Sequence, residues 1–165
     1  MKYFKNTTKK TLKTIPFTTQ KYKQMQEKVV ELEETKQQVM QRLITAREMG
    51  DLSENGAYKY AKIELGTIRR EIQKYKRLLD QGFVAPKHFG SKQYIDFGTT
   101  VTVQKYETQK LVTFMIVSEH ESNPSQGKLS YSSPMGKVLI RKKVGDVVVI
   151  ETPNGSAKYT IINVS

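Results

Sequence analysis

The sequence predicts an α+β protein: an N-terminal antiparallel coiled-coil hairpin, followed by a small antiparallel sheet domain that carries one helix. Three observations predict this class. Apolar residues recur at alternating steps of three and four along two long segments between residues 20 and 79, which is the seam pattern of a coiled coil. A short interruption with two glycines separates these segments. Short β-branched runs bounded by turn residues then fill the C-terminal half, as expected for strands.

The hairpin is expected over residues 16–84, with its first helix beginning near Gln20 after an N-cap at Thr18 or Thr19. One polar residue, Lys36, interrupts the first seam, and we expect it to set the register of the helix pair. Two helices of roughly 30 residues joined by a tight turn should form an antiparallel rod about 40–45 Å long. The first seam comprises Tyr22, Met25, Val29, Leu32, Lys36, Val39, Leu43 and Ala46, and the second Ala61, Leu65, Ile68, Ile72, Tyr75 and Leu79.

The second domain is expected over residues 85–165. Its predicted strands cover residues 99–106, 110–118, 129–132, 147–152 and 157–164. Pro134 can occupy the first turn of a short helix that continues through Ile140. Asn154-Gly155 is a strong hairpin signal between the last two strands.

The net charge of +12 is uneven, since residues 1–14 contain five lysines and no acidic residue. We expect residues 1–15 to be a basic, disordered tail, and not a secretory signal, because no apolar segment follows the lysines. The basic excess favours a polyanionic neighbour such as nucleic acid, or an acidic protein surface. It is equally compatible with a simple solubility charge.

The composition excludes several classes of site. The chain has no cysteine and only two histidines, which excludes disulfides and zinc–cysteine sites and argues against a histidine metal site. No apolar run approaches the roughly 20 residues of a membrane-spanning helix. A soluble, cytoplasmic protein with no membrane partner is therefore expected.

The turn of the hairpin, Gly50-Asp-Leu-Ser-Glu-Asn-Gly-Ala-Tyr58, carries the candidate chemistry. In a purely structural interpretation, Gly50 ends the first helix in the left-handed conformation, while Asp51 caps the second helix and Glu54 completes a capping box. At the exposed end of a rod, however, such acids contribute at most about 1 kcal/mol. Two carboxylates are also what Mg²⁺ takes in addition to substrate phosphate oxygens. Such a pair becomes effective beside another enzyme's metal and phosphodiester.

Two motifs give the chain a family resemblance. The tip run from Arg47 to Tyr58, followed by Ala61-Lys62 and the heptads, resembles the signature of the GreA/GreB transcript cleavage factors. The runs Ser133-Pro-Met-Gly-Lys-Val-Leu139 and Val144-Gly-Asp-Val-Val-Val-Ile-Glu-Thr-Pro-Asn-Gly155 resemble the second domain of that family. The resemblance covers residues 16–164 and implies an FKBP-like fold for the second domain.

The resemblance implies a function inside bacterial RNA polymerase. The globular domain would dock at the secondary channel and the hairpin would enter it, so that the tip stimulates Mg-dependent cleavage of backtracked nascent RNA. The polymerase active site would perform the hydrolysis. The protein would then be a monomeric accessory factor, not an enzyme, with no stably bound cofactor and with Mg²⁺ supplied within the polymerase.

The same resemblance assigns roles to tip residues. Asp51 and Glu54 match the two essential acids of the family, which assist the second metal ion of the polymerase. Four further residues are expected to contact polymerase or RNA. These are Arg47 and Lys62, which match basic positions beside the tip, and Asn55 and Tyr58, which match its structural residues.

One departure keeps alternatives open. Ala57 stands where family members usually have a further acid. The chain could therefore be a paralogue that occupies the same channel as a non-cleaving inhibitor or regulator. A third hypothesis is that the basic tail and the rod form a nucleic-acid-binding module that acts without polymerase.

Overall fold

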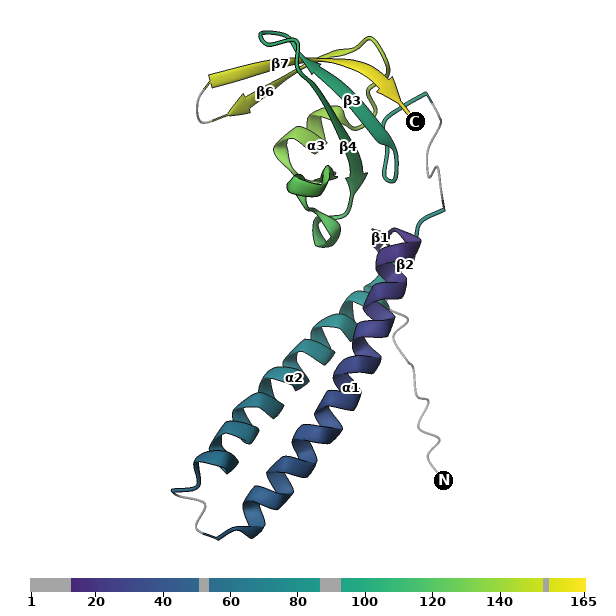
Figure 1. The fold of residues 1–165 in the computed structure, drawn as a ribbon. Coiled ribbons are helices and arrows are strands. Elements are labelled where there is room, and N and C mark those ends of the chain that lie inside the picture. Colours follow the sequence, from purple (N-terminus) through teal and green to yellow (C-terminus); the bar gives the residue numbers. More distant parts are fainter. Residues whose placement is uncertain (1–12, 51–53, 87–92, 153–154) are drawn as a thin grey trace, which may run out of the picture. The chain divides into compact units, whose positions relative to one another are not determined.

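We describe a computed structural model of the chain, covering residues 13–50, 54–86, 93–152 and 155–165 (Figure 1). The chain folds as two compact units. One contains Tyr22–Gly82, and the other contains Ile15–Lys21 together with Phe83–Ser165. The predicted basic tail lies outside the described residues, apart from its last few positions.

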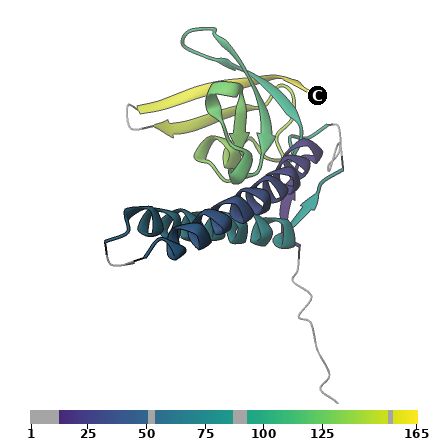
Figure 2. The same ribbon diagram turned by 60° about the horizontal axis from the view of Figure 1, so that its bottom comes forward.

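The first unit is the predicted helical hairpin. Helix α1 (Thr19–Glu48) and helix α2 (Gly56–Gln81) lie side by side and antiparallel in both views (Figures 1 and 2). Every fully buried residue of the two helices is a predicted seam position, and each buried aliphatic side chain is worth about 1.5–3 kcal/mol. The hairpin and its seam are therefore confirmed. The buried residues are Met25, Leu32, Val39 and Ala46 of α1 and Ala61, Leu65, Ile68 and Ile72 of α2.

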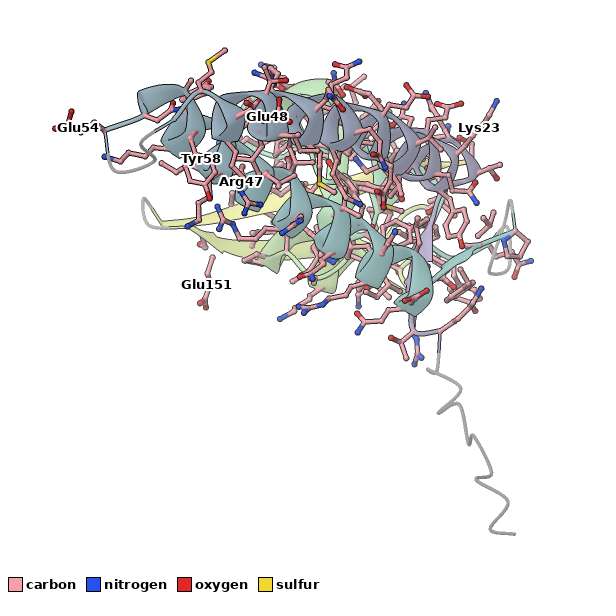
Figure 3. The ribbon with its side chains drawn as sticks, turned by 90° about the horizontal axis from the view of Figure 1, so that it is seen from below. Lys23, Arg47, Glu48, Glu54, Tyr58 and Glu151 are labelled. Atoms are coloured by element: carbon pink, nitrogen blue, oxygen red, sulfur yellow. The ribbon has the colours of Figure 1, made fainter. Side chains whose placement is uncertain are left out.

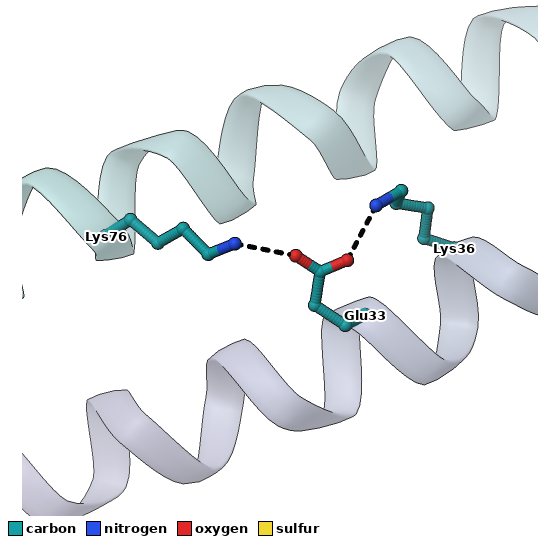
Figure 4. Close-up of polar contacts among 3 residues, drawn as sticks. All are labelled: Glu33, Lys36 and Lys76. Carbon is teal, nitrogen blue, oxygen red and sulfur yellow. Dashed lines mark hydrogen bonds and ion pairs between the residues drawn. The ribbon is translucent and has the colours of Figure 1, made fainter.

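An ionic cluster joins the two helices at the polar seam position (Figure 4). The Glu33 carboxylate accepts hydrogen bonds from Lys36 Nζ at 2.7 Å and, across the helix pair, from Lys76 Nζ at 2.8 Å. These two hydrogen bonds lower the pKa of Glu33 to about 2. The polar seam residue Lys36 is therefore paired with Glu33, and Lys76 links Glu33 to the second helix.

The start of α1 is held within the second unit. Thr18 is the N-cap, since its Oγ1 accepts from the Lys21 N–H at 3.2 Å. The Thr18 N–H and Oγ1–H in turn donate to the two carboxylate oxygens of Glu121 at 2.8 and 2.6 Å. Glu121 is buried, so these charge-assisted bonds supply the partners that a buried carboxylate needs. Just before this cap, β1 (Ile15–Phe17) pairs with β2 (Gly82–Val84) in a two-stranded sheet.

The second unit contains a five-stranded sheet in the order β5-β4-β3-β7-β6, with helix α3 (Pro134–Leu139). All five predicted strands and the predicted helix are present, which confirms the α+β class. Two 3₁₀ turns, η1 (Glu119–Glu121) and η2 (Pro124–Gln126), connect β4 to β5. The strands are β3 (Thr100–Lys105), β4 (Leu111–Val117), β5 (Lys128–Ser130), β6 (Val147–Thr152) and β7 (Gly155–Val164).

The sheet differs from the expectation in one pair. β4 and β5 run parallel, whereas β3–β4, β3–β7 and β6–β7 are antiparallel. The expectation of an entirely antiparallel sheet was wrong at this edge, because β4 and β5 are not joined by a tight hairpin turn. The two 3₁₀ turns between them return the chain so that β5 starts beside Met115 and runs in the direction of β4.

The core of this unit lies between the sheet and α3. It contains Ile95, Val101, Val103, Ile116, Leu129, Leu139, Val148 and Ile161. Gly136 brings α3 close to β5, because a Cβ at this position would overlap the carbonyl group of Ser130. The Ser133 side chain caps this helix by accepting from the Gly136 N–H at 3.0 Å, as the Ser-Pro start predicts.

Candidate functional site at the hairpin tip

The tip lies between the last turn of α1 and the first turn of α2. Helix α1 ends at Glu48, and Gly50 has a φ of +113°, a conformation that favours glycine at a helix C-terminus. Helix α2 begins at Gly56 with Asn55 as its N-cap. The interpretation in which Asp51 caps the second helix is therefore wrong, since the helix starts four residues later than that interpretation requires. Asp51 itself lies outside the described residues.

Glu54 precedes this cap and lies outside both helices. Its side chain is exposed and projects away from the end of the hairpin (Figure 3). Within the described part of the chain, its carboxylate has no hydrogen-bond or ion-pair partner. With Asn55 as the N-cap of α2, Glu54 does not complete a capping box.

In contrast to Glu54, Asn55 forms hydrogen bonds within the tip through both polar atoms of its side-chain amide. Its Oδ1 accepts from the Tyr58 N–H at 2.9 Å, and its Nδ2 donates to the Ala46 carbonyl oxygen at 2.7 Å. The resemblance matches Asn55 to a structural residue of the tip, and in the structure its side chain joins the end of α1 to the start of α2.

The remaining predicted tip residues lie on the two helices. Arg47 is exposed in the last turn of α1, and Lys62 is exposed on α2, one turn beyond Tyr58. Tyr58 is half-buried, and Figure 3 shows it on the same side of the tip as Arg47. Arg47 and Lys62 are thus exposed on the parts of the two helices that flank the tip.

Sequence reasoning missed an apolar groove of about 370 Å³ next to the tip. Ala57 lines it with the exposed side chains of Met49 and Tyr60, which are 72% and 67% accessible. The sequence signal for this groove was the presence of two large apolar residues, Met49 and Tyr60, outside the predicted seams. The other lining residues are Gln41, Arg42, Thr45, Ala46 and Ala61.

The tip offers oxygen donors and no complete metal site of its own. Among residues 13–50, 54–86, 93–152 and 155–165, no three His, Cys, Asp or Glu side chains form a group that could hold a metal ion. The exposed carboxylate of Glu54 matches the hard oxygen donors that Mg²⁺ prefers, and it would need ligands from another molecule to complete a site.

Comparison with known proteins agrees with both units. Residues 15–82 match the family described as Transcription elongation factor, N-terminal, and residues 90–165 match Transcription elongation factor, GreA/GreB, C-term. The N-terminal and C-terminal halves of the chain thus match the N-terminal and C-terminal domains of the same family of transcription factors. The chain belongs to the GreA/GreB family of transcription elongation factors.

Individual relatives cover nearly the whole chain. The transcription elongation factor GreA of Neorickettsia sennetsu is 32% identical over 93% of this chain and 97% of its own length. GreA of Thermosipho africanus is 38% identical over 81% of this chain and 87% of its own length. Among solved structures, the chain aligns with the crystal structure of GreA factor homolog 1 of Thermus thermophilus, with a TM-score of 0.43 and 24% sequence identity. The alignment covers 92% of this chain and 98% of that protein's chain.

In the described part of the chain, no helix is both long and apolar enough to cross a membrane.

Proposed function

We propose that this protein binds bacterial RNA polymerase, inserts its hairpin tip into the secondary channel, and stimulates Mg-dependent endonucleolytic cleavage of backtracked nascent RNA. The polymerase active site performs the hydrolysis, and the factor acts as a cytoplasmic monomer without a stably bound cofactor. Membership of the GreA/GreB family supports the partner and the process. The observation that carries the cleavage role is the free Glu54 carboxylate at the end of the hairpin.

The rod explains how that carboxylate reaches a confined active site. Helices of 30 and 26 residues extend about 39–45 Å at 1.5 Å per residue. The buried seam and the Glu33 cluster keep the two helices paired, so the tip is delivered as one body. A flexible loop of the same length would lose conformational entropy on insertion that the paired helices have already lost.

The tip residues then have distinct proposed roles. Glu54 and Asp51 assist the binding of the second Mg²⁺ together with ligands of the polymerase. When bound there, Mg²⁺ supplies charge neutralisation at the phosphodiester and lowers the pKa of a bound water. Arg47 and Lys62 contact the phosphate groups of RNA or acidic groups of the polymerase, and the Tyr58 ring packs against the surface that the tip enters.

The test is transcript cleavage in purified backtracked elongation complexes, with saturating factor and varied Mg²⁺. Glu54→Gln and Asp51→Asn keep the size of the side chain and remove the charge. Each is expected to lower the cleavage rate by about 10²-fold or more, in the range for loss of a group that acts on transition-state charge. Glu34→Gln, an exposed glutamate elsewhere on α1, is the matched control. Unchanged cleavage by both tip variants would contradict the proposed role of these acids.

A second function is favoured by one observation. Ala57 is exposed at the start of α2 and lines the apolar groove, where the family usually places an acid. A tip with less negative charge could occupy the channel and regulate nucleotide addition without cleavage. In that case the protein would slow nucleotide addition in complexes that are not backtracked, and no short RNA fragments would be released from backtracked complexes.

A further inference from the structure

The tip contains one side chain whose two polar atoms are both bonded within the hairpin. Asn55 Oδ1 caps α2 at the Tyr58 N–H, and Asn55 Nδ2 caps α1 at the Ala46 carbonyl oxygen. The orientation of the amide follows from these partners, since an N–H group requires the oxygen and a carbonyl group requires the nitrogen. Asn55 therefore supplies the acceptor for an N–H group in the first turn of α2 and adds a second, shorter hydrogen bond to the Ala46 carbonyl oxygen, which also accepts from the Met49 N–H at 3.3 Å.

This bridge brackets the segment that carries the tip acids. Ala46 and Asn55 are nine positions apart in the chain. Asp51 lies between them in sequence, and Glu54 is the residue next to Asn55. The hydrogen bond from Asn55 to Ala46 holds the start of α2 against the end of α1, on the two sides of this segment.

Few side chains can make both bonds. An ionised aspartate keeps the acceptor for Tyr58 but places an oxygen against the Ala46 carbonyl oxygen. A serine keeps the cap with a single hydroxyl that is shorter than the amide and does not reach Ala46. Asparagine supplies a donor and an acceptor on two separate atoms, at 2.7 and 2.9 Å from their partners.

We propose that Asn55 is a positioning residue, and that its bridge between α1 and α2 fixes the start of α2 so that the neighbouring Glu54 reaches the polymerase active site in one arrangement. The expectation that Asn55 contacts polymerase or RNA stays a prediction, and the positioning role is inferred from the two hydrogen bonds within the tip. The inference rests on the proposed cleavage function. Misplacement of reacting groups by about 1 Å can cost roughly 10²-fold in rate.

The test uses Asn55→Ser and Asn55→Asp, which keep the cap on Tyr58 and lose the bond to Ala46, and Asn55→Ala, which loses both. Hydrogen exchange of the Tyr58 amide in the free factor should stay slow in the first two variants and become fast in the third. All three are expected to lower the cleavage rate at saturating factor by about tenfold or more. They should also raise the Mg²⁺ concentration for half-maximal cleavage, while their affinity for polymerase, measured by competition with wild type, stays unchanged.

Gln38→Ala removes an exposed amide from α1 away from the tip and should match wild type in every measurement. Full cleavage by Asn55→Ser and Asn55→Asp, at the wild-type Mg²⁺ requirement, would overturn the inference, as would a loss confined to polymerase affinity. Glu54→Gln in the same assay separates the two proposals. If Glu54→Gln cleaves as well as wild type, the proposed cleavage role of Glu54 is wrong. If Glu54→Gln loses cleavage while the Asn55 variants keep full cleavage, only the positioning role of Asn55 is wrong.

Discussion

At the scale of single residues, the tip separates side chains that hold the turn from side chains that face outward. Asn55 is bonded to both helices, whereas Glu54 has no partner among the described residues. The resemblance pointed to both residues, but the sequence did not give the hydrogen-bond partners of Asn55. Asp, Asn and Ser are similarly good N-caps, so the pattern Asp51 to Glu54 was a plausible start for the second helix. The observed start at Gly56 removes the capping explanation for Glu54.

Restoring an acid at Ala57 tests the significance of the departure from the family pattern. Ala57→Glu places a carboxylate in the first turn of α2, where it interacts favourably with the helix dipole by about 0.3–1 kcal/mol. We expect a hairpin of equal or higher stability and a lower Mg²⁺ concentration for half-maximal transcript cleavage. Ala57→Gln is the neutral control. A Glu variant that cleaves no better than the Gln variant would show that charge at this position does not limit the reaction.

Gly136 predicts a local stability effect in the second unit. Gly136→Ala should destabilise that unit by about 1–3 kcal/mol, because the added methyl group overlaps the Ser130 carbonyl and forces α3 away from β5. Gly66→Ala in α2 is the matched control, since its new Cβ meets only Arg70 at an ordinary distance of 3.8 Å. It should stabilise its own helix by about 0.5–1 kcal/mol.

Urea unfolding followed by NMR signals from each unit measures both glycine variants separately. A neutral Gly136→Ala would mean that α3 shifts without cost, and would contradict the close packing of this helix.

At the scale of elements, the sequence predicted most of the fold because its periodic signals are long. The two seams extend over 25 residues (22–46) and 19 residues (61–79), and every buried residue of the two helices belongs to them. The strands of the second unit were found from β-branched runs. The parallel β4–β5 pair was not predicted, because periodicity within a strand does not indicate the direction of its neighbour. The free carboxylate, the double cap and the groove depend on side-chain contacts that periodicity does not specify.

The Glu33 cluster predicts a pH dependence for the hairpin. The folded-state pKa of Glu33, about 2, lies below its ordinary value of 4.5 because Lys36 and Lys76 donate to the carboxylate. A lowered pKa means that the ionised form stabilises the fold. This contribution is complete above about pH 4.5 and is lost as the pH falls towards about 2. Glu33→Gln should therefore be less stable than wild type near neutral pH, and the difference should shrink across this window.

Thermal unfolding followed by helical circular dichroism at several pH values measures this difference. Glu34→Gln, which changes an exposed glutamate next to Glu33, should show no matching loss in the same window. A constant difference between wild type and Glu33→Gln from neutral pH down to about pH 2 would contradict a stabilising role for the ionised carboxylate.

At the scale of the whole molecule, family membership and tip chemistry answer different questions. The two family matches establish a GreA/GreB transcription elongation factor. At the tip, the chain has an exposed acid at Glu54 and an alanine at position 57. The transcript-cleavage measurement distinguishes the two proposed functions.

The most direct measurement of the central claim is the release of short 3′ RNA fragments from backtracked elongation complexes labelled at the RNA 3′ end. With unmodified factor and Mg²⁺, we predict rapid release of short labelled fragments and resumed elongation after nucleotides are added. Glu54→Gln should still bind the complexes but release fragments no faster than polymerase alone. If the unmodified factor binds the complexes, slows nucleotide addition and releases no fragments, the cleavage function is contradicted.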